Sequence, residues 1–210
     1  MKAVVFANGE NPEPAVVREA LADAGLTVAA DGATDHALSH GVVPDIVIGD
    51  LDSLSDRARA KLPEGRIVHD PDPDRTDLQK AVETCLDRGA SEITVLGAGG
   101  RRADHALANL SVLFLYRERA PVTFLDERFA ITAAAERTRL DGPPGTVVSL
   151  VAIGTCSGVT TRGLRWDLAD ASLEFSPRGV HNEIRTSPAT VFVRSGDLLV
   201  FKGRWIEKHR

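Results

Sequence analysis

The sequence predicts an α/β protein, with an N-terminal three-layer domain built on a mostly parallel sheet and a small C-terminal antiparallel β-sandwich. Up to about residue 126, short β-branched runs alternate with helical patterns, which is typical of parallel strands covered by helices. From about residue 128, short strand-like runs are separated by Gly, Ser and Asp turns, after Gly-Pro-Pro-Gly at 142–145. We therefore expect two domains, residues 1–127 and 128–210.

The α/β half is expected to alternate strand and helix throughout. Its predicted strands are 3–6, 27–30, 45–48, 66–69, 92–96 and 122–125. Its predicted helices are 14–24, a helix after Asp31, one starting near Ser55, 76–88 and 104–117. The β half is expected to hold short strands near 146–153, 171–175, 181–186, 190–194 and 197–202.

Composition restricts the class of protein. The chain has 210 residues, 43% of them hydrophobic, and a net charge of −5, which does not suggest a nucleic-acid or membrane partner. Its two cysteines, Cys85 and Cys156, fit buried thiols in a reducing compartment better than a disulfide framework. The first residues run directly into a strand without a signal-peptide pattern, and no apolar run reaches transmembrane length. We expect a cytoplasmic protein.

Two carboxylates follow the third predicted strand. Asp50 and Asp52 come after an apolar run that ends at Gly49. Residues i and i+2 of an extended chain lie on one side, so the two acids converge, and a cation relieves their repulsion. Oxygen ligands of this kind suit Mg²⁺, which usually shares its other positions with phosphate. The alternative is a polar turn in which Asp52 and Ser53 cap the following helix.

Three other strands also end in polar segments. Asp31-Gly32 follows one strand, the segment 70–77 follows another, and 97–104 follows the next. Ligands collect beyond the carboxyl ends of parallel strands, so these segments predict one site. The alternatives are a proline-stiffened loop with Thr76 as a helix cap, and a common glycine-rich turn without a P-loop lysine. His36 and His40 lack a third ligand with matching spacing, so we leave them out of the site.

In order along the chain, the segments resemble the thiamine pyrophosphokinase family, also called thiamine diphosphokinase, over nearly the whole sequence. The matching segments are Ala30-Asp31-Gly32, Ile48 to Ser53, Asp74-Arg75-Thr76-Asp77, Gly97 to His105, Asn109-Leu110, Gly163-Leu164, Asn182-Glu183 and Gly196 to Leu199. The resemblance implies Mg²⁺ and ATP as donor and thiamine as acceptor, with thiamine diphosphate and AMP as products. It also implies a homodimer whose active sites lie between subunits.

The resemblance assigns roles by position. Asp50, Asp52 and Asp77 would bind the metal, and Asp31, Arg102 and Asp104 would form the reaction centre. Thr76, Arg75 and Gly100 would bind the nucleotide, and Asn182 would face thiamine. Residues 1–127 would thus be the nucleotide- and metal-binding domain, and residues 128–210 the acceptor-binding and dimerisation domain. Whether Asp31 or Asp104 orients or deprotonates the hydroxyl stays open.

The chain departs from the family pattern at several positions. Ala33 replaces a second glycine, Gly99-Gly100-Arg101 replaces Thr-Gly-Gly, Arg75 replaces the frequent lysine, and His181 replaces a serine before Asn182. Trp166 could stack on thiamine or pack in a core or an interface. Two other functions remain: a pyrophosphokinase acting on another hydroxymethyl heterocycle such as a pterin alcohol, and a non-catalytic nucleotide-binding module.

Overall fold

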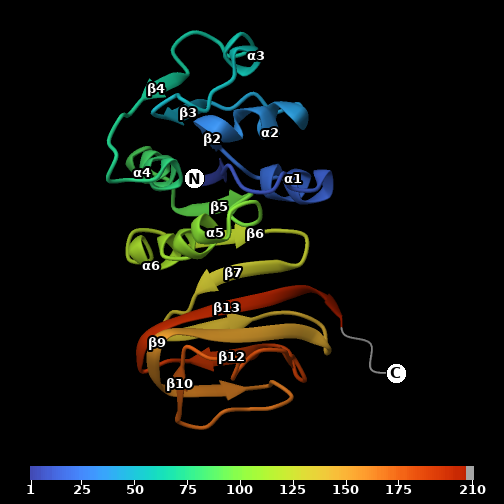
Figure 1. Cartoon of the computed structure of the whole chain (residues 1–210). Helices are drawn as coiled ribbons and strands as arrows, with labels where there is room; N and C mark the ends of the chain where they lie inside the picture. The colour runs from blue at the N-terminus through green and yellow to red at the C-terminus, as the bar shows by residue number, and fades with distance from the viewer. Residues whose placement is uncertain (207–210) are drawn as a thin grey trace. The chain divides into compact units, whose positions relative to one another are not determined.

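The structure is a computed structural model that describes residues 1–206. The chain divides into two compact units, residues 1–127 and 128–210 (Figure 1). Both cysteines are free and buried, as the sequence predicts. Among the described residues, every helix is too short or too polar to span a lipid bilayer.

The first unit is built on a six-stranded parallel sheet with the strand order β4-β3-β2-β1-β5-β6. The strands are β1 (Lys2–Phe6), β2 (Leu26–Ala30), β3 (Ile46–Gly49), β4 (Ile67–His69), β5 (Glu92–Leu96) and β6 (Val122–Leu125). Consecutive residues of the central strands, such as Val4 and Val5, are both buried, because helices cover both faces of the sheet. The predicted parallel sheet is confirmed.

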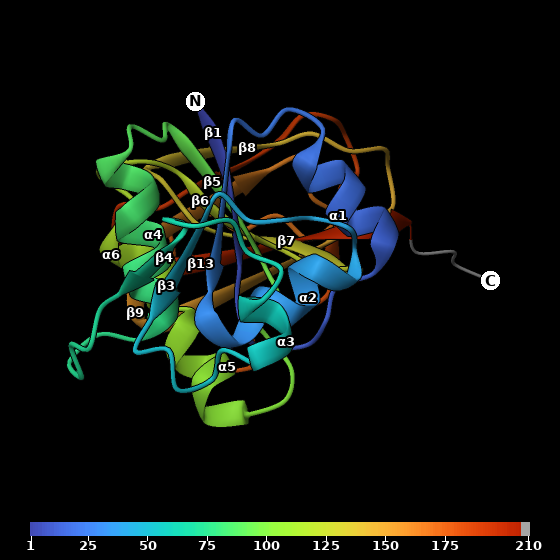
Figure 2. The ribbon, with the colours of Figure 1, turned by 90° about the horizontal axis from the view of Figure 1, so that it is seen from above.

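Helices form the two outer layers of this unit. They are α1 (Pro14–Leu21), the 3-10 turn η1 (Asp31–Ala33), α2 (Thr34–Ser39), α3 (Asp56–Arg59), α4 (Asp77–Asp87), α5 (Ala103–Asn109) and α6 (Val112–Leu115). Helices α1 and α2 lie on one face of the sheet, and α4 and α6 lie on the other (Figure 2). Apolar residues of α1 and α2, such as Val17 and Ala37, share a buried cluster with Phe6 and Val47.

The single helix predicted over 104–117 is wrong, because the chain forms two short helices there. Leu110 and Ser111 donate their backbone N–H groups three residues back, to Leu107 and Ala108, which tightens the turn. The Ser111 hydroxyl also donates to the Ala108 carbonyl, and such a local side-chain bond to the backbone competes with a continuous helix. The Asn109 amide connects the end of α5 to the Ala98 carbonyl.

The second unit is antiparallel throughout residues 128–206, with the strand order β7-β13-β9-β12-β8 and with β10 and β11 paired to β9. Its strands are β7 (Phe129–Ala133), β8 (Arg137–Leu140), β9 (Thr146–Arg162), β10 (Ala171–Glu174), β11 (Asn182–Glu183), β12 (Ala189–Phe192) and β13 (Ser195–Ile206). Strand β9 pairs with four other strands, β10, β11, β12 and β13. It bounds one apolar core that includes Leu150, Cys156 and Val191. The antiparallel β architecture is confirmed, whereas β7 and β8 were not predicted and β9 extends well beyond residue 153.

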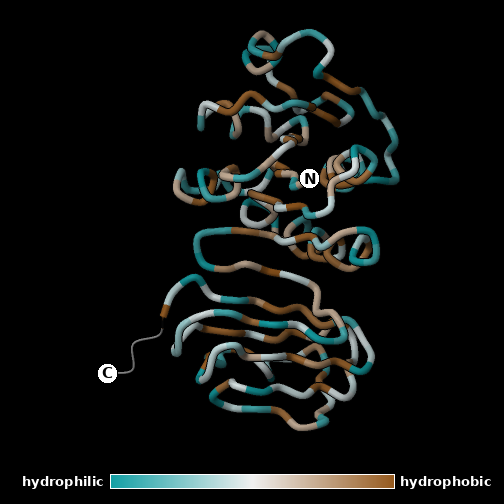
Figure 3. The backbone as a smooth tube through the Cα atoms, turned by 180° about the vertical axis from the view of Figure 1, so that it is seen from behind, coloured by the Kyte–Doolittle hydropathy of each residue, from teal (hydrophilic) through white to brown (hydrophobic). Residues whose placement is uncertain are grey.

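The carboxyl ends of the parallel strands carry the polar loops of the first unit. The connection from β4 to α4 is a continuous hydrophilic stretch, whereas the neighbouring strands are apolar (Figure 3). The loops after β1, β3 and β5 begin at the same edge of the sheet, because these strands run parallel. The fold therefore brings together segments that are far apart in the sequence.

Candidate functional site

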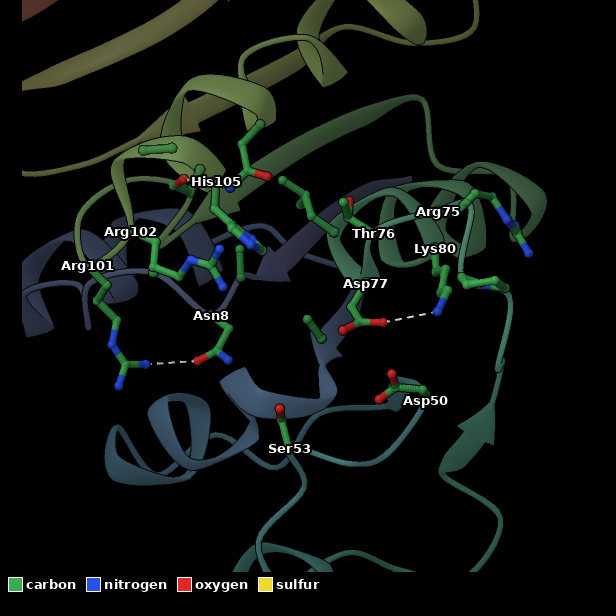
Figure 4. Close-up of a pocket in the computed structure, with 18 of the residues that line it drawn as sticks. Asn8, Asp50, Ser53, Arg75, Thr76, Asp77, Lys80, Arg101, Arg102 and His105 are labelled. Carbon is green, nitrogen blue, oxygen red and sulfur yellow. Dashed lines mark hydrogen bonds and ion pairs between the residues drawn. The ribbon is translucent and has the colours of Figure 1, made fainter.

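A pocket of about 840 Å³ lies at this edge of the first unit (Figure 4). Its walls come from the loops after β1, β3, β4 and β5, from the last residue of β2, from the first turn of α4 and from helix α5. One end presents carboxylates, including Asp50 and Asp77, and the other end presents Arg101, Arg102 and His105. The pocket thus has a cation-attracting end and an anion-attracting end.

Three carboxylates meet at the acidic end. One oxygen from each of Asp31, Asp50 and Asp77 lies within 4.8 Å of the others. They come from η1, from the loop after β3 and from the first residue of α4. Asp31 is buried, with 2% of its surface exposed. The structure therefore brings together two of the three predicted metal ligands and adds Asp31, which the sequence placed in the reaction centre.

Backbone groups hold the Asp31 carboxylate in place. Its two oxygens accept hydrogen bonds from the N–H groups of Gly32 at 2.5 Å and Leu51 at 2.8 Å. A Cβ atom on Gly49 would lie 2.6 Å from the Asp31 carboxyl carbon, so only glycine fits at the end of β3. Leu51 has a φ of +68°, a left-handed conformation that is costly for a branched residue. This turn is shaped to place its N–H group beside Asp31.

The electrostatics of the three acids fit a divalent cation. Burial raises the pKa of Asp31, and the charges of Asp77 and Asp50 raise it further. The pKa of Asp50 is lowered, first by the hydrogen bond from the Asp52 N–H group. Clustered carboxylate oxygens are the ligands that Mg²⁺ prefers, and a cation would offset the repulsion that raises the pKa of Asp31.

Asp52 lies beside this group but outside it. Its N–H group donates to Asp50 at 3.1 Å, and its carboxylate accepts a hydrogen bond from the Ser53 hydroxyl at 2.8 Å. The cap of α3 is Ser55, whose hydroxyl accepts a hydrogen bond from the Ala58 N–H group. The alternative in which Asp52 and Ser53 cap this helix is therefore wrong. A metal-binding role for Asp52 stays a prediction.

Thr76 fixes the start of α4 and so the position of Asp77. The Thr76 hydroxyl accepts a hydrogen bond from the Gln79 N–H group, and the Gln79 side chain accepts one from the Thr76 N–H group. This capping box makes Asp77 the first helical residue. Thr76 thus acts as the predicted cap and also lines the pocket.

The Arg75 guanidinium binds carboxylates of its own loop and helix. It contacts Asp70 and Asp72 at 2.9 Å each and Glu83 at 2.5 Å. Figure 4 shows it directed away from Asp50 and Asp77. The hydrogen bonds that Arg75 donates to Glu83 and Asp72 raise the pKa of Arg75, so the side chain stays charged. The geometry gives Arg75 a role in holding the 70–77 loop, and its predicted contact with nucleotide remains a prediction.

Lys80 is a site residue that the sequence reasoning missed. Its side chain is 3% exposed, and its ammonium donates to the Asp70 carbonyl at 2.8 Å and to the Asp77 carboxylate at 3.2 Å. It lines the pocket at the acidic end. The signal in the sequence was a lysine one helical turn after Asp77, in a helix whose other buried residues are all apolar.

The basic end is formed by the loop between β5 and α5. Gly100 has a φ of +76°, and a Cβ atom there would lie 2.6 Å from the Glu10 Cβ atom, so glycine is required. Arg101 also has a positive φ, +49°, and its guanidinium donates to the Asn8 side chain at 3.1 Å. Arg102 and His105 point into the pocket (Figure 4).

Arg102 and Asp104 form a two-bond ion pair. The Arg102 guanidinium donates to the two Asp104 oxygens at 3.1 and 2.6 Å. The hydrogen bond from Arg102 lowers the pKa of Asp104 to about 2. At neutral pH this carboxylate is ionised and a weak proton acceptor. The structure therefore brings two predicted catalytic residues together, on the rim opposite the acidic trio.

Asn182 belongs to the second unit, where it binds a loop backbone. Its side-chain oxygen accepts from the N–H groups of Trp166 at 3.2 Å and Glu183 at 2.8 Å, and its amide donates to the Trp166 carbonyl at 2.8 Å. The Trp166 residue is 54% exposed, with the Arg165 guanidinium 4.9 Å from its ring centroid. Trp166 is thus not a core residue, and Asn182 fixes the loop that presents it.

Comparison with known proteins adds independent findings. The sequence profile of the thiamin pyrophosphokinase catalytic domain matches residues 17–124, and that of the thiamin pyrophosphokinase vitamin B1 binding domain matches residues 137–198. Thiamin pyrophosphokinase 1 of Caenorhabditis elegans is 30% identical over 206 residues, covering 86% of this chain and 81% of its own length.

Two further similarities concern the fold and a related activity. The crystal structure of thiamine pyrophosphokinase from Bacillus subtilis aligns with a TM-score of 0.85 at 21% identity, covering 97% of this chain and 99% of its own. A 6-hydroxymethyl-7,8-dihydropterin pyrophosphokinase of Pyrococcus furiosus is 35% identical over 92 residues, 43% of this chain and 39% of its own length. The pterin relative therefore resembles less than half of this chain.

Proposed function

This chain belongs to the thiamine pyrophosphokinase family, and we propose that it transfers the diphosphoryl group of ATP to the hydroxyl of thiamine, giving thiamine diphosphate and AMP. The observation that carries this proposal is the pocket with carboxylates at one end and arginines at the other. Phosphoryl-type transfer depends mainly on positioning and on neutralising phosphate charge, and this distribution of charge serves both.

At the acidic end, Asp31, Asp50 and Asp77 would hold Mg²⁺, with Asp52 next to them. The bound ion would supply positive charge to the phosphates. Two of the three residues are held in place, because Asp31 is fixed by two backbone N–H groups and Asp77 by the capped start of α4, whereas Asp50 is exposed. The binding of Mg²⁺ by these acids is part of our proposal.

At the basic end, Arg102 would bind phosphate oxygens of ATP and of the departing AMP, with Gly100 allowing close approach of the loop backbone. A guanidinium can donate two parallel hydrogen bonds to a phosphate. Asp104 engages the Nε and Nη2 groups of Arg102, so the remaining N–H donors of the guanidinium are the ones that would bind phosphate. Thr76 and the N–H groups at the start of α4 would lie on the opposite wall of the nucleotide site.

The thiamine hydroxyl must lose a proton during transfer. Between the two candidate bases, Asp104 is the weaker proton acceptor, because Arg102 lowers its pKa to about 2. Burial and neighbouring charges raise the pKa of Asp31 in the metal-free protein. In our proposal Asp31 holds Mg²⁺, so this raised pKa does not make it the proton acceptor. We therefore assign metal binding to Asp31 and the positioning of Arg102 to Asp104.

We propose that the second unit contributes to the thiamine site through Asn182 and Trp166. Three hydrogen bonds already engage the Asn182 side chain, so its main effect would be on the loop that carries Trp166. An exposed indole is a suitable surface for a flat heterocycle. A homodimeric state and a cytoplasmic location also remain proposals, drawn from the family resemblance and from the sequence.

A pterin alcohol is the second candidate acceptor, because the Pyrococcus furiosus pterin enzyme resembles part of this chain. The match of residues 137–198 to a vitamin B1 binding domain favours thiamine. A non-catalytic nucleotide-binding module is the third candidate.

The test is AMP release from ATP and Mg²⁺ with thiamine, with 6-hydroxymethyl-7,8-dihydropterin or with no acceptor. We expect AMP to form with thiamine alone, accompanied by equimolar thiamine diphosphate. AMP release with the pterin alone would identify the second candidate. No release with either acceptor, together with nucleotide binding, would identify a binding module.

A further inference from the structure

Lys80 occupies an unusual place for a lysine. It lies on α4 one turn after Asp77, and its side chain is 3% exposed, whereas the Asp77 side chain is 33% exposed. Burying an ammonium costs several kcal/mol unless its partners compensate, and an apolar residue of similar length would avoid that cost. Packing alone therefore does not explain a lysine at this position.

The hydrogen bonds of Lys80 leave donor capacity toward the pocket. A lysine ammonium has three N–H donors and accepts no hydrogen bonds. Two contacts lie within the protein, to the Asp70 carbonyl at 2.8 Å and to the Asp77 carboxylate at 3.2 Å. Lys80 lines the pocket, and its ammonium faces the space that Asp77 and Asp50 also face (Figure 4).

Arg75, the neighbouring basic residue, does not direct its charge into the space beside Asp50 and Asp77. Arg75 is held by three carboxylates, Asp70, Asp72 and Glu83, and its guanidinium points away from Asp50. The Arg101 and Arg102 side chains lie at the opposite end of the pocket. Lys80 is therefore the cation of the described pocket lining that stands at the carboxylate end with its charge directed inward.

We propose that Lys80 is a phosphate-binding residue, whose ammonium donates a hydrogen bond to the phosphates of a nucleoside triphosphate nearest to the carboxylate end. This inference rests on the proposed nucleotide site. A metal ion held by Asp31, Asp50 and Asp77 and the ammonium of Lys80 would then flank the same anion. Through its bond to Asp77, Lys80 would also balance the negative charge of the three acids before ligands bind.

The test compares Lys80→Met with the parent and with Lys61→Met, which removes an exposed lysine from the same unit. Binding of α,β-methylene-ATP and of AMP is measured by calorimetry without acceptor. Binding of Mn²⁺ to the nucleotide-free protein is measured by electron paramagnetic resonance. Because hydrogen bonds to charged groups contribute about 1.5–3 kcal/mol, Lys80→Met should weaken the binding of α,β-methylene-ATP about 10- to 100-fold.

Two further readouts separate phosphate binding from support of the fold. AMP, which lacks the terminal phosphates, should bind the parent and Lys80→Met equally. Mn²⁺ should bind Lys80→Met as well as or better than the parent, because a positive charge near Asp77 is gone. A purely structural lysine predicts the opposite, a loss of Mn²⁺ affinity in parallel with nucleotide affinity, and that result would overturn the proposal.

Equal α,β-methylene-ATP affinity of parent and Lys80→Met would also overturn it. Should Lys80→Met not fold, Lys80→Gln, which keeps a donor for the Asp70 carbonyl, undergoes the same measurements. If the parent itself binds no α,β-methylene-ATP, the proposed function fails. If the parent binds it but releases no AMP with thiamine, only the proposed reaction fails, and the comparison of Lys80 variants still decides the role of Lys80.

Discussion

The two ends of the pocket differ in how firmly the protein holds their side chains. At the acidic end, the Asp31 residue is 2% exposed and the Lys80 side chain 3%, and both are fixed by backbone groups. At the basic end, the Arg102 side chain is 69% exposed and pairs with Asp104, whose side chain is 64% exposed. Asp31 and Lys80 are thus preorganised, whereas the Arg102–Asp104 pair can adapt; Asp50 is the exposed member of the acidic end.

This difference matches the chemistry of the two ligand types. Mg²⁺ demands nearly ideal octahedral geometry at short distances, so its ligands benefit from rigid placement. Phosphate groups tolerate several hydrogen-bond geometries and change during the reaction, so long arginine side chains suit them. Substitutions at the acidic end should therefore abolish function, whereas those at the basic end should reduce it by degrees.

The largest effect is expected from Asp50→Asn at the acidic end. Since a catalytic metal ion contributes several kcal/mol to transition-state stabilisation, loss of one carboxylate ligand should lower kcat/KM about a thousandfold. The measurement is AMP release with ATP, Mg²⁺ and thiamine, with far-ultraviolet circular dichroism as the check on folding.

Asp52→Asn is the matched comparison, because Asp52 lies outside the group of three. We expect a loss at least tenfold smaller than that of Asp50→Asn. Equal losses in the two variants would restore Asp52 to the set of metal ligands that the sequence predicts. Full activity of Asp50→Asn would remove the metal assignment from this cluster.

At the basic end, Arg102→Lys should lower kcat about 10- to 100-fold while the melting temperature stays nearly unchanged, because a point charge replaces a two-pronged donor. The exposure of this side chain explains why stability is spared. Arg101→Ala is the control, since Arg101 binds Asn8 instead of Asp104. A silent Arg102→Lys beside a damaging Arg101→Ala would shift the functional arginine by one position.

The sequence predicted the alternation of strands and helices correctly because apolar periodicity and burial are local consequences of the parallel sheet. The strand predicted over 92–96 is β5 without any shift, and that over 122–125 is β6. The break between α5 and α6 escaped prediction, because the apolar pattern at Leu107, Leu110 and Leu113 continues across it. The change to three-residue hydrogen bonds at Leu110 and Ser111 leaves no signal in that pattern.

For the site, the sequence indicated which loops converge but not how their side chains divide the work. The convergence follows from strand order, which parallel topology makes predictable. Arg75 and Lys80 show the limit: in sequence the arginine beside Thr76 looks like the phosphate ligand, yet three carboxylates bind it. Lys80 is less exposed than Arg75, and its ammonium faces the pocket (Figure 4). The orientation of α4 determines this, and the sequence does not show that orientation.

Backbone conformation offers a smaller and separate contrast at the basic end. Arg101 has a φ of +49°, where a residue with a Cβ atom carries a cost of about 1–2 kcal/mol. Because glycine lacks that cost but loses more chain entropy, Arg101→Gly should raise the stability by about 0.5–1 kcal/mol. Thermal melting measures it, with Arg88→Gly at the exposed end of α4 as a control that should not be stabilised. A lower melting temperature for Arg101→Gly would show that the bond to Asn8 outweighs the strain.

The smallest expected effect is a change with pH in the melting temperature of Asp31→Asn relative to the parent. Burial and the charges of Asp77 and Asp50 raise the pKa of Asp31 above its usual value of 3.8. The folded state therefore holds this proton more tightly than the unfolded state, so ionisation of Asp31 costs stability as pH rises through the raised pKa.

In metal-free protein, Asp31→Asn lacks this cost but also loses an acceptor for the Leu51 N–H group. The constant loss cancels when the melting temperatures of variant and parent are compared across pH. Their difference should move in favour of Asp31→Asn as pH increases above 3.8 toward the raised pKa, and Mg²⁺ should reverse the trend by stabilising the parent. A difference that does not change with pH would show that the buried carboxylate is not destabilised by its neighbours, and that the acidic end needs no cation to balance it.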